Sequence, residues 1–407
     1  MRRALLVWIL LLAADHPAQL PIAELPPDLR EQAAEVQRAW KQYPDNPCVL
    51  YQVAAMYAQA GHKSEALATL RVMVGKHSGV DPRVRDGFQS LADDSEFLRL
   101  KQQIRAEYPS IYNAHPAFSI SEADLIPEGI AWSKKQRRFY LGSVKRKIIE
   151  IDDAGNARDF VPPATDGLGV VVGLRVDDAR GELWAASERM SPHAGLVRGV
   201  FRYRLSDRKL LAKYSVRDGE ADLVNDLTVA PNGTLYATAS NSGSLIRIRP
   251  GSGEAEIFLP PHTLADPNGI TVSADGKYLF VAGWYGITRV DLRTRATLLL
   301  KSSSHIAAGC FDGLYQYKGD LVGIQNCVHD SGRVLRLHLS ERQDEIVSER
   351  VLESYNPLFE GITTGAIADG HFYFMANTQF RKMGPGGSIP SDAKFNPIQV
   401  LELDLER

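Results

Sequence analysis

The segment GITVSADGKYLFVAG, residues 269–283, shows the pattern that decides the fold of this chain. Two short apolar strand-like runs flank a turn at Asp275-Gly276, which is typical of a β-hairpin. Similar turns occur at Asn232-Gly233, Lys318-Gly319 and Asp369-Gly370, the residue types that two-residue hairpins with positive φ require. Five further segments share the design and begin at residues 129, 173, 226, 313 and 365: GIAWSKKQRRFYLGS, GLRVDDARGELWAAS, DLTVAPNGTLYATAS, GLYQYKGDLVGIQN and GAIADGHFYFMAN.

The spacing of these six copies predicts the architecture. Successive copies begin about 43 to 53 residues apart, which is long enough for four antiparallel strands in each unit. Six such units predict an all-β six-bladed β-propeller over residues 115–407. Residues 118–120 and the run 398–405 are expected to pair in the last blade, because this closure removes exposed sheet edges.

A different periodicity precedes the propeller. Over residues 27–108 apolar positions recur three and four apart, which predicts a small α-helical region. Residues 50–73 match the large, small, aromatic and turn positions of a tetratricopeptide-like repeat, and residues 88–104 suggest a further, degenerate helix pair. Two interpretations stay open: a helical cap packed on the propeller, and an array that recruits a protein partner.

The first 18 residues have the features of a signal peptide. Arg2 and Arg3 precede an apolar run over residues 4–14 that ends in small residues. The run is short for a membrane span, so we expect no transmembrane span after its removal and a secreted or periplasmic protein. The alternative is an uncleaved N-terminal anchor.

Composition and cysteine content exclude some classes of function. The 407 residues include 47 Lys and Arg against 49 Asp and Glu, so the basic excess typical of nucleic-acid binders is missing. Three cysteines cannot form a disulfide framework, and no Cys/His spacing resembles a zinc site. Cys310 and Cys327 are expected to lie close together, either as a disulfide or as two free thiols, whereas Cys48 is expected in the helical core.

The propeller prediction brings six residues to one mouth of the central channel. The innermost strand of each blade lines the channel, so the residues just before the repeats converge there. Four of the six carry the carboxylate or amide oxygens that hard cations prefer, and we predict that they bind Ca²⁺ or another divalent cation. The alternative, that they only form turns, accounts for Asn268 and Asp312 but not for Glu128. The six residues are Glu128, Val172, Asn225, Asn268, Asp312 and Thr364.

Four motifs in chain order resemble a known family. PEGIAW (residues 127–132), VNDLTVAPNG (224–233), PNGITVSADGKYLFVAG (267–283) and FDGLYQYKGDLVG (311–323) are similar to the senescence-marker-protein, gluconolactonase and luciferin-regenerating-enzyme family, which is related to the paraoxonases. The resemblance begins at about residue 118 and does not include the helical region. It implies a six-bladed, calcium-dependent propeller that hydrolyses lactones or, in some members, phosphotriesters.

The same resemblance implies roles for individual residues. Glu128, Asn268 and Asp312 fall on the family's metal ligands, and Asn225 on a further ligand or substrate-orienting amide. Leu223 departs from the pattern, because gluconolactonase-like members carry an arginine there that contacts the sugar acid. This departure disfavours sugar lactones and favours a less polar substrate, or none.

Two functional hypotheses follow. The first is an exported calcium-dependent hydrolase of a small-molecule lactone or ester, in which calcium polarises the carbonyl oxygen. Asp312 or Glu128 would orient or deprotonate the attacking water, and Asn225 and Asn268 would place the substrate. The second is a non-catalytic, calcium-stabilised propeller that binds a ligand or protein, with the helices recruiting a partner.

Overall fold

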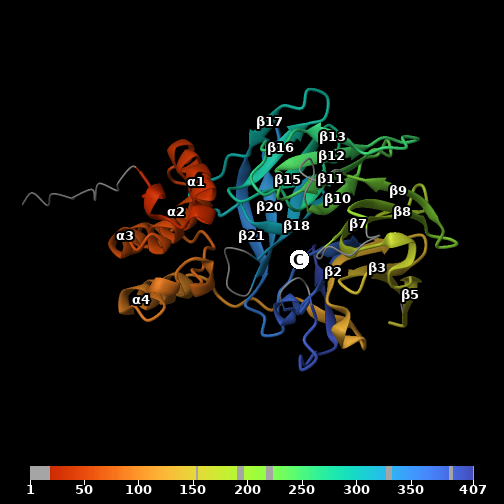
Figure 1. The fold of residues 1–407 in the computed structure, drawn as a ribbon, viewed down its shortest axis with the longest axis horizontal. Helices are drawn as coiled ribbons and strands as arrows, with labels where there is room; N and C mark the ends of the chain where they lie inside the picture. The colour runs from red at the N-terminus through yellow and green to blue at the C-terminus, as the bar shows by residue number, and fades with distance from the viewer. Residues whose placement is uncertain are drawn as a thin grey trace, which may run out of the picture.

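Six four-stranded antiparallel sheets surround a central channel in a computed structural model of the chain (Figure 1). The structure describes residues 19–152, 155–189, 197–216, 223–326, 332–384 and 388–406. The strands of the first three blades are β2 (Pro127–Ser133), β3 (Arg138–Ser143), β4 (Lys147–Asp152) and β5 (Ala157–Val161); β6 (Val170–Asp177), β7 (Glu182–Glu188), β8 (Gly199–Arg204) and β9 (Leu210–Ser215); and β10 (Val224–Val229), β11 (Leu235–Ala239), β12 (Ser244–Ile248) and β13 (Glu256–Leu259).

The remaining three blades complete the six-bladed propeller and confirm the predicted fold. Their strands are β14 (Ile270–Val272), β15 (Tyr278–Ala282), β16 (Ile287–Asp291) and β17 (Thr297–Leu299); β18 (Phe311–Tyr317), β19 (Asp320–Gln325), β20 (Arg333–Leu339) and β21 (Ile346–Ser354); and β22 (Gly365–Ala368), β23 (His371–Met375), β24 (Ile398–Asp404) and β1 (His115–Ile120).

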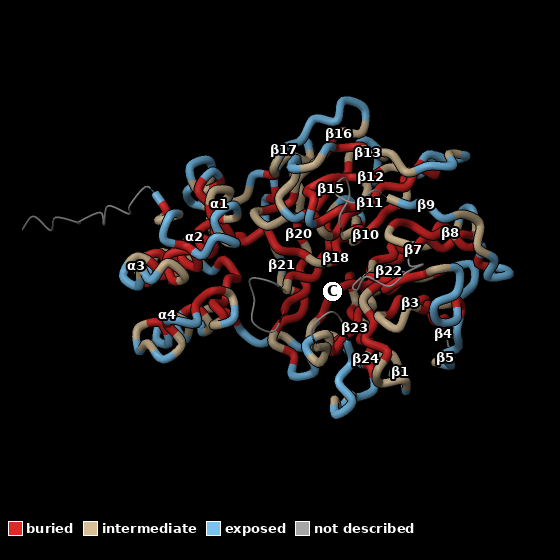
Figure 2. Tube along the Cα trace, viewed as in Figure 1, coloured by how far each residue is buried: buried red, intermediate tan, exposed pale blue. Residues whose placement is uncertain are grey.

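The last blade closes the propeller as predicted. β1 pairs antiparallel with β24, so that Ile120 lies opposite Ile398. The blade thus combines one strand from before the first repeat with three from the end of the chain. Figure 2 shows the buried inner strands around the channel, while the outer strands β5 and β9 are more exposed.

Two of the four glycine turns are the predicted two-residue hairpins. Lys318-Gly319 and Asp369-Gly370 have positive φ at both positions. At Asn232-Gly233 and Asp275-Gly276 only the glycine has positive φ, and that part of the prediction is wrong. The reason is loop length, because a backbone bond from Gly276 N to Ser273 O closes a wider turn.

The helical region contains four α-helices, as its periodicity predicts, with short 3₁₀ turns between them. Asn46 begins the central helix α2 (Pro47–Gln59) by accepting hydrogen bonds from the backbone N–H groups of Cys48 and Val49. Ala54 and Ala66 are fully buried and let α2 and α3 (Lys63–Met73) pack closely. The predicted helix pair over residues 88–104 is wrong, because a 3₁₀ turn, η4 (Gln89–Leu91), precedes a single helix there. The helices are α1 (Arg30–Gln42), α2 (Pro47–Gln59), α3 (Lys63–Met73) and α4 (Ser95–Ala106).

The helices share a hydrophobic core with the propeller. Ala307 and Cys310 of the propeller belong to the helical core cluster, and Trp284 packs against it. Arg333 of β20 is fully buried at this junction, where its Nε donates to Gln325 and its Nη2 contacts the carbonyl oxygen of Ser78 at 3.4 Å. The helical region is therefore docked on one side of the propeller, next to β17, β20 and β21 (Figure 1), as the cap interpretation expects.

Two sequence predictions fall partly outside the described residues. The predicted signal peptide, residues 1–18, lies outside them. No helix in the described part of the chain is both long and apolar enough to cross a membrane. Cys48 is a buried free thiol, whereas Cys310 is disulfide-bonded, so the alternative of a free Cys310 is wrong. Cys327 lies outside the described residues.

Candidate active site

β-Bulges turn four of the six predicted channel residues out of the regular strand pattern. Glu128 of β2, Val172 of β6, Asn225 of β10 and Asp312 of β18 each lie where the pairing register of the innermost strand shifts. A bulge inserts an extra residue, bends the strand and re-aims a side chain. Asn268 lies just before β14, at the same end of the inner strands. We call Glu128, Asn225, Asn268 and Asp312 the mouth residues.

A left-handed residue stands two positions before every mouth residue. Left-handed backbone costs a residue other than glycine about 1–2 kcal/mol, and such strain concentrates at functional sites. The other two channel positions, Val172 and Thr364, have no such residue two positions before them. The left-handed backbone thus distinguishes the four mouth residues from Val172 and Thr364. The left-handed residues are Ile126 (φ 44°), Leu223 (58°), Asp266 (47°) and Cys310 (63°).

Glycines let the inner strands approach one another behind the mouth residues. An added Cβ at Gly129 would lie 2.6 Å from the carbonyl oxygen of Val172, and one at Gly269 would lie 2.4 Å from that of Asp312. Contacts this short exclude any side chain, so the repeats keep glycine here. In the third blade Asp226 takes the position instead, and it is the one repeat start that is not glycine.

Asp312 is the centre of the hydrogen-bond network at the mouth. Its Oδ2 accepts a 2.6 Å hydrogen bond from Asn326 Nδ2, and its carboxylate is also hydrogen-bonded by the Asn268 side chain. Asn268 Oδ1 is buried and receives no hydrogen bond from any residue in the described part of the chain. A buried oxygen without a donor is costly, so this atom is available to a cation.

Asn225 is held beside this network rather than within it. Its Nδ2 donates to Ser240 Oγ at 3.0 Å, and that hydroxyl donates to the carbonyl oxygen of Pro267 at 2.7 Å. Pro267 directly precedes Asn268, so the two amides lie on neighbouring segments. Thr364 instead donates its hydroxyl to the backbone carbonyl of Glu128.

The two mouth carboxyl groups resist ionisation. Burial raises the pKa of Glu128 to about 8, and the negative charges of Asp312 and Asp226 add to the effect. Burial likewise raises the pKa of Asp312 to about 6, although hydrogen bonds from Asn326 and Asn268 favour its charged form. Two carboxyl groups that cannot easily ionise together form a place where a cation is stabilising.

The donor set has a definite chemical character. Among the residues that the structure describes, no three His, Cys, Asp or Glu side chains are grouped closely enough to hold a metal. At the mouth, the described residues offer a metal amide oxygens beside the two carboxyl groups. Glu128, Asn268 and Asp312 are brought together, and Asn225 lies beside them. The other two channel residues are poor metal ligands: Val172 has a buried aliphatic side chain, and the Thr364 hydroxyl already donates to the Glu128 carbonyl oxygen.

Three neighbours of the mouth residues were not predicted as site residues. Asn326 positions Asp312 by a hydrogen bond. The only sequence feature that identifies Asn326 is its place directly after β19. Asp226 accepts from Leu227 N at 2.8 Å and lies 3.6 Å from Arg175 Nη2. Arg175 Nε also donates to the carbonyl oxygen of Leu227 and its guanidinium lies over the Tyr315 ring, so it bridges inner strands inside the channel. The break in the glycine pattern at Asp226 could have identified that residue.

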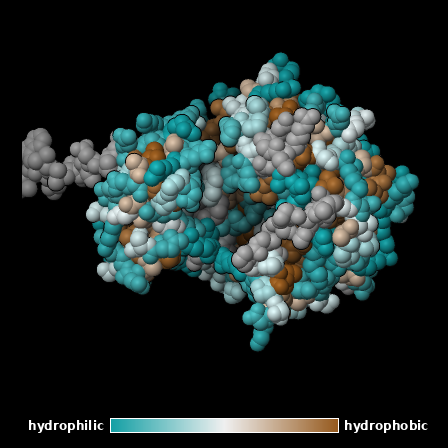
Figure 3. Space-filling model, viewed as in Figure 1, coloured by the Kyte–Doolittle hydropathy of each residue, from teal (hydrophilic) through white to brown (hydrophobic). Residues whose placement is uncertain are grey.

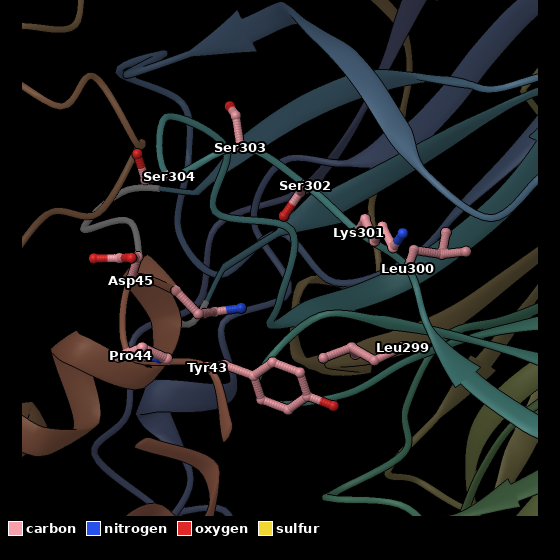
Figure 4. Close-up of a pocket in the computed structure, with 10 residues that line it drawn as sticks. Tyr43, Pro44, Asp45, Leu299, Leu300, Lys301, Ser302, Ser303 and Ser304 are labelled. Atoms are coloured by element: carbon pink, nitrogen blue, oxygen red, sulfur yellow. The ribbon is translucent and has the colours of Figure 1, made fainter. Parts of the chain in front are cut away.

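The face of the propeller seen in Figure 3 is hollowed near its middle, and much of the surface beside this hollow is hydrophilic. A separate depression of about 260 Å³ lies between the α1–α2 turn and residues 299–304, where Tyr43, Ser302 and Leu299 line it (Figure 4). It contains none of the mouth residues, so it is not the candidate site.

Comparisons with known proteins agree on the fold. No family model matches the chain, and no curated protein matches it in sequence, so the tetratricopeptide-like assignment stays a prediction. A gluconolactonase from Xanthomonas campestris is similar in structure, with 16% identity, 72% of this chain and 91% of that chain covered, and a TM-score of 0.51. The calcium-binding protein regucalcin from Agrobacterium tumefaciens is 14% identical over 73% of this chain and 97% of that chain, with a TM-score of 0.50. The chain thus has the β-propeller fold of these two proteins.

Proposed function

We propose that this chain is a calcium-dependent hydrolase of lactones or related esters that acts at the mouth residues. The observation that carries the proposal is Asn268 Oδ1, a buried oxygen with no donor among the described residues, beside a carboxyl pair with raised pKa values. The similar gluconolactonase and regucalcin structures support the proposal through the shared fold.

The residues present fit a calcium ion. The mouth offers two carboxylates and two amide oxygens, and calcium takes six to eight oxygen ligands in flexible geometry, so water or substrate would supply the rest. Zinc fits poorly, because none of the mouth residues is a histidine or a cysteine. A divalent cation would also offset the repulsion that keeps Glu128 and Asp312 from ionising together.

Different mouth residues have different roles in the proposed ester hydrolysis. When bound, calcium would supply a Lewis acid that polarises the substrate carbonyl. Asp312 accepts two amide donors that favour its carboxylate form, so we assign it the role of a fixed negative ligand. Glu128, with the higher pKa, is better suited to take the proton of the attacking water and to return it to the leaving alkoxide oxygen. Asn225 is placed to orient the substrate from the adjacent blade.

Leu223 restricts the class of substrate. An aliphatic side chain stands where the resemblance expects an arginine, so the mouth lacks the cation that would hold a sugar acid there. We therefore propose a neutral lactone or ester. The disulfide at Cys310 and the predicted signal peptide support an exported protein in an oxidising compartment.

A second candidate is a calcium-stabilised binding module. The helices that pack against Trp284 and Ala307 favour it, because they add a surface beside the mouth that a partner could contact. Both candidates require the metal, so metal binding alone does not separate them.

A hydrolysis assay separates the two candidates. Purified protein should hydrolyse at least one member of a panel of neutral lactones, carboxylic esters and phosphotriesters, and a chelator should abolish the activity until calcium is restored. Glu128→Gln should lose most of the turnover, whereas Glu341→Gln, at an exposed turn position, should retain it. Calcium binding without hydrolysis of any substrate would leave the binding module as the function.

A further inference from the structure

A cleft of about 610 Å³ lies between helix α1 and the rim of the propeller. One wall is a single face of α1, which carries Gln32, Glu35, Arg38 and Gln42 at spacings of three and four residues. The other wall consists of residues 240–243, residues 262–266 and the aromatic pair Trp284 and Tyr285. The cleft therefore needs both the helical region and the propeller.

The cleft lies next to the mouth residues, although none of them lines it. Ser240, which accepts the hydrogen bond from Asn225, is part of its lining. Asp266 also lines it, stands two residues before Asn268, and is close enough for its charge to act on Asp312. A ligand in the cleft would thus lie beside Asn225 and Asp312.

Trp284 joins this cleft to a second depression. Gln32 and Trp284 also line a space of about 260 Å³ whose other walls include Gln52 and Arg83. Arg83 Nη1 donates to the carbonyl oxygen of Asn326 at 2.7 Å, and Asn326 in turn holds Asp312. Each hollow is therefore connected to the mouth residues through a hydrogen-bonded neighbour, and together the two hollows suit a ligand longer than a single ring.

The polar lining is mainly neutral. The α1 wall and the second depression present Gln32, Gln42 and Gln52, and the facing loop presents Asn241. Amide side chains donate and accept hydrogen bonds at once, as ligand hydroxyl groups also do. Of the charged groups, Glu35 and Arg38 pair at 4.0 Å and Arg83 pairs with Asp86, while Asp266 adds one carboxyl group to the lining.

The aromatic lining supplies apolar contact. Trp284 and Tyr285 are partly exposed on the β15–β16 loop, and Asn46 Nδ2 holds this loop by donating to the carbonyl oxygen of Tyr285 at 2.8 Å. Aromatic side chains combine a broad apolar face with a polar edge. Amides around such faces match a molecule with hydroxyls at its edge and C–H groups on its faces.

We infer that this cleft binds a neutral, hydroxyl-rich part of a ligand, such as a glycosyl chain, and that α1 sets its specificity. The inference rests on the proposed function only in placing the reactive ester or lactone group at the mouth residues. Binding of the glycosyl part depends on the cleft alone.

Binding of neutral trisaccharides to the full-length chain tests this inference. Malto-, cello-, xylo- and chitotriose would be titrated by calorimetry and by tryptophan fluorescence, with trigalacturonate and octanoate as charged and apolar probes. We expect at least one neutral trisaccharide to bind, and Trp284→Ala and Gln32→Ala to weaken that binding at least tenfold. Gln102→Ala, an exposed glutamine of α4 outside the cleft, is the matched control and should bind like the wild type.

Two further outcomes separate this inference from the proposed function. Asp312→Asn, assayed with chelator, should still bind the trisaccharide while hydrolysis is lost, so the failure of hydrolysis leaves the cleft intact. The inference is overturned if no neutral trisaccharide binds, if octanoate or trigalacturonate binds more tightly, or if Trp284→Ala and Gln32→Ala bind as the wild type does. Circular dichroism of both variants confirms that they are folded.

Discussion

Replacing Glu128 with glutamine should make the calcium-free protein more stable at alkaline pH. Burial, followed by the charges of Asp312 and Asp226, raises the pKa of Glu128 from its ordinary 4.5 to about 8 in the folded chain. Between these values the folded chain holds a proton that the unfolded chain releases. The free energy of unfolding therefore falls as the pH rises through this window. Glutamine cannot ionise, so the variant should lose this dependence.

The structure sets the size of the effect. A pKa unit corresponds to about 1.4 kcal/mol, so the shift at Glu128 gives an upper limit of roughly 5 kcal/mol. Glu128 is half-buried at the mouth of the channel, and screening by solvent there reduces the expected gain to roughly 1–3 kcal/mol. Burial also raises the pKa of Asp312, to about 6. The free energy of unfolding therefore falls further as the pH rises toward 6.

Urea unfolding of chelator-treated protein at pH 5, 6.5, 8 and 9 measures this difference. The wild type should lose stability from pH 5 to pH 9, and Glu128→Gln should have a flatter profile and exceed the wild type at pH 9. Saturating calcium should restore the wild type at pH 9, by about 2.7 kcal/mol at a hundred times its Kd, and should restore the variant far less. Glu341→Gln should follow the wild type throughout. Parallel pH profiles for the wild type and Glu128→Gln would refute the reasoning.

Three other substitutions or truncations test separate parts of the structure. Gly79→Ala should lower the free energy of unfolding by roughly 2–4 kcal/mol more than Gly75→Ala does. Both glycines have left-handed backbone, but only at Gly79 would a Cβ lie 2.0 Å from the buried Arg333 side chain. Equal melting temperatures of the two variants would contradict this. A chain that begins at residue 109 should melt lower and aggregate, because it exposes Ala307 and Trp284, whereas unchanged solubility would indicate a separate helical domain. Asn225→Ala should lower kcat at least tenfold with little change in calcium affinity, as measured by steady-state kinetics and calorimetry, because its amide faces Ser240 and not Asp312; a parallel loss of affinity would make it a principal ligand.

The sequence predicted those features that repeat or that lie next to a repeat. The hairpins set the register of each blade, so the repeat pattern alone assigned Glu128, Asn268 and Asp312 to one mouth of the channel. The closure of β1 on β24 followed from the need to remove free edges.

Features that depend on contacts between distant residues were not predictable in this way. Asn326 acts on Asp312 through a side-chain bond at the end of β19, and no repeat marks its position. The cleft joins Gln32 to Trp284, which lie far apart in the chain, and the periodicity of α1 shows only that one face is polar. Asp226 was not predicted as a site residue, although it stands where the other five repeats have glycine and that difference could have identified it.

Calcium titration of the chelator-stripped protein by isothermal calorimetry tests the central claim most directly. At pH 8 the wild type should bind one calcium ion at the mouth, and Asp312→Asn and Asn268→Ala should each weaken binding at least tenfold, since they remove a carboxylate charge and the buried amide oxygen without a donor. Thr364→Ala, whose hydroxyl is engaged by the Glu128 carbonyl, should bind calcium like the wild type. A wild-type protein that binds no calcium, or variants at Asn268 and Asp312 that bind it unchanged, would contradict the assignment of these residues.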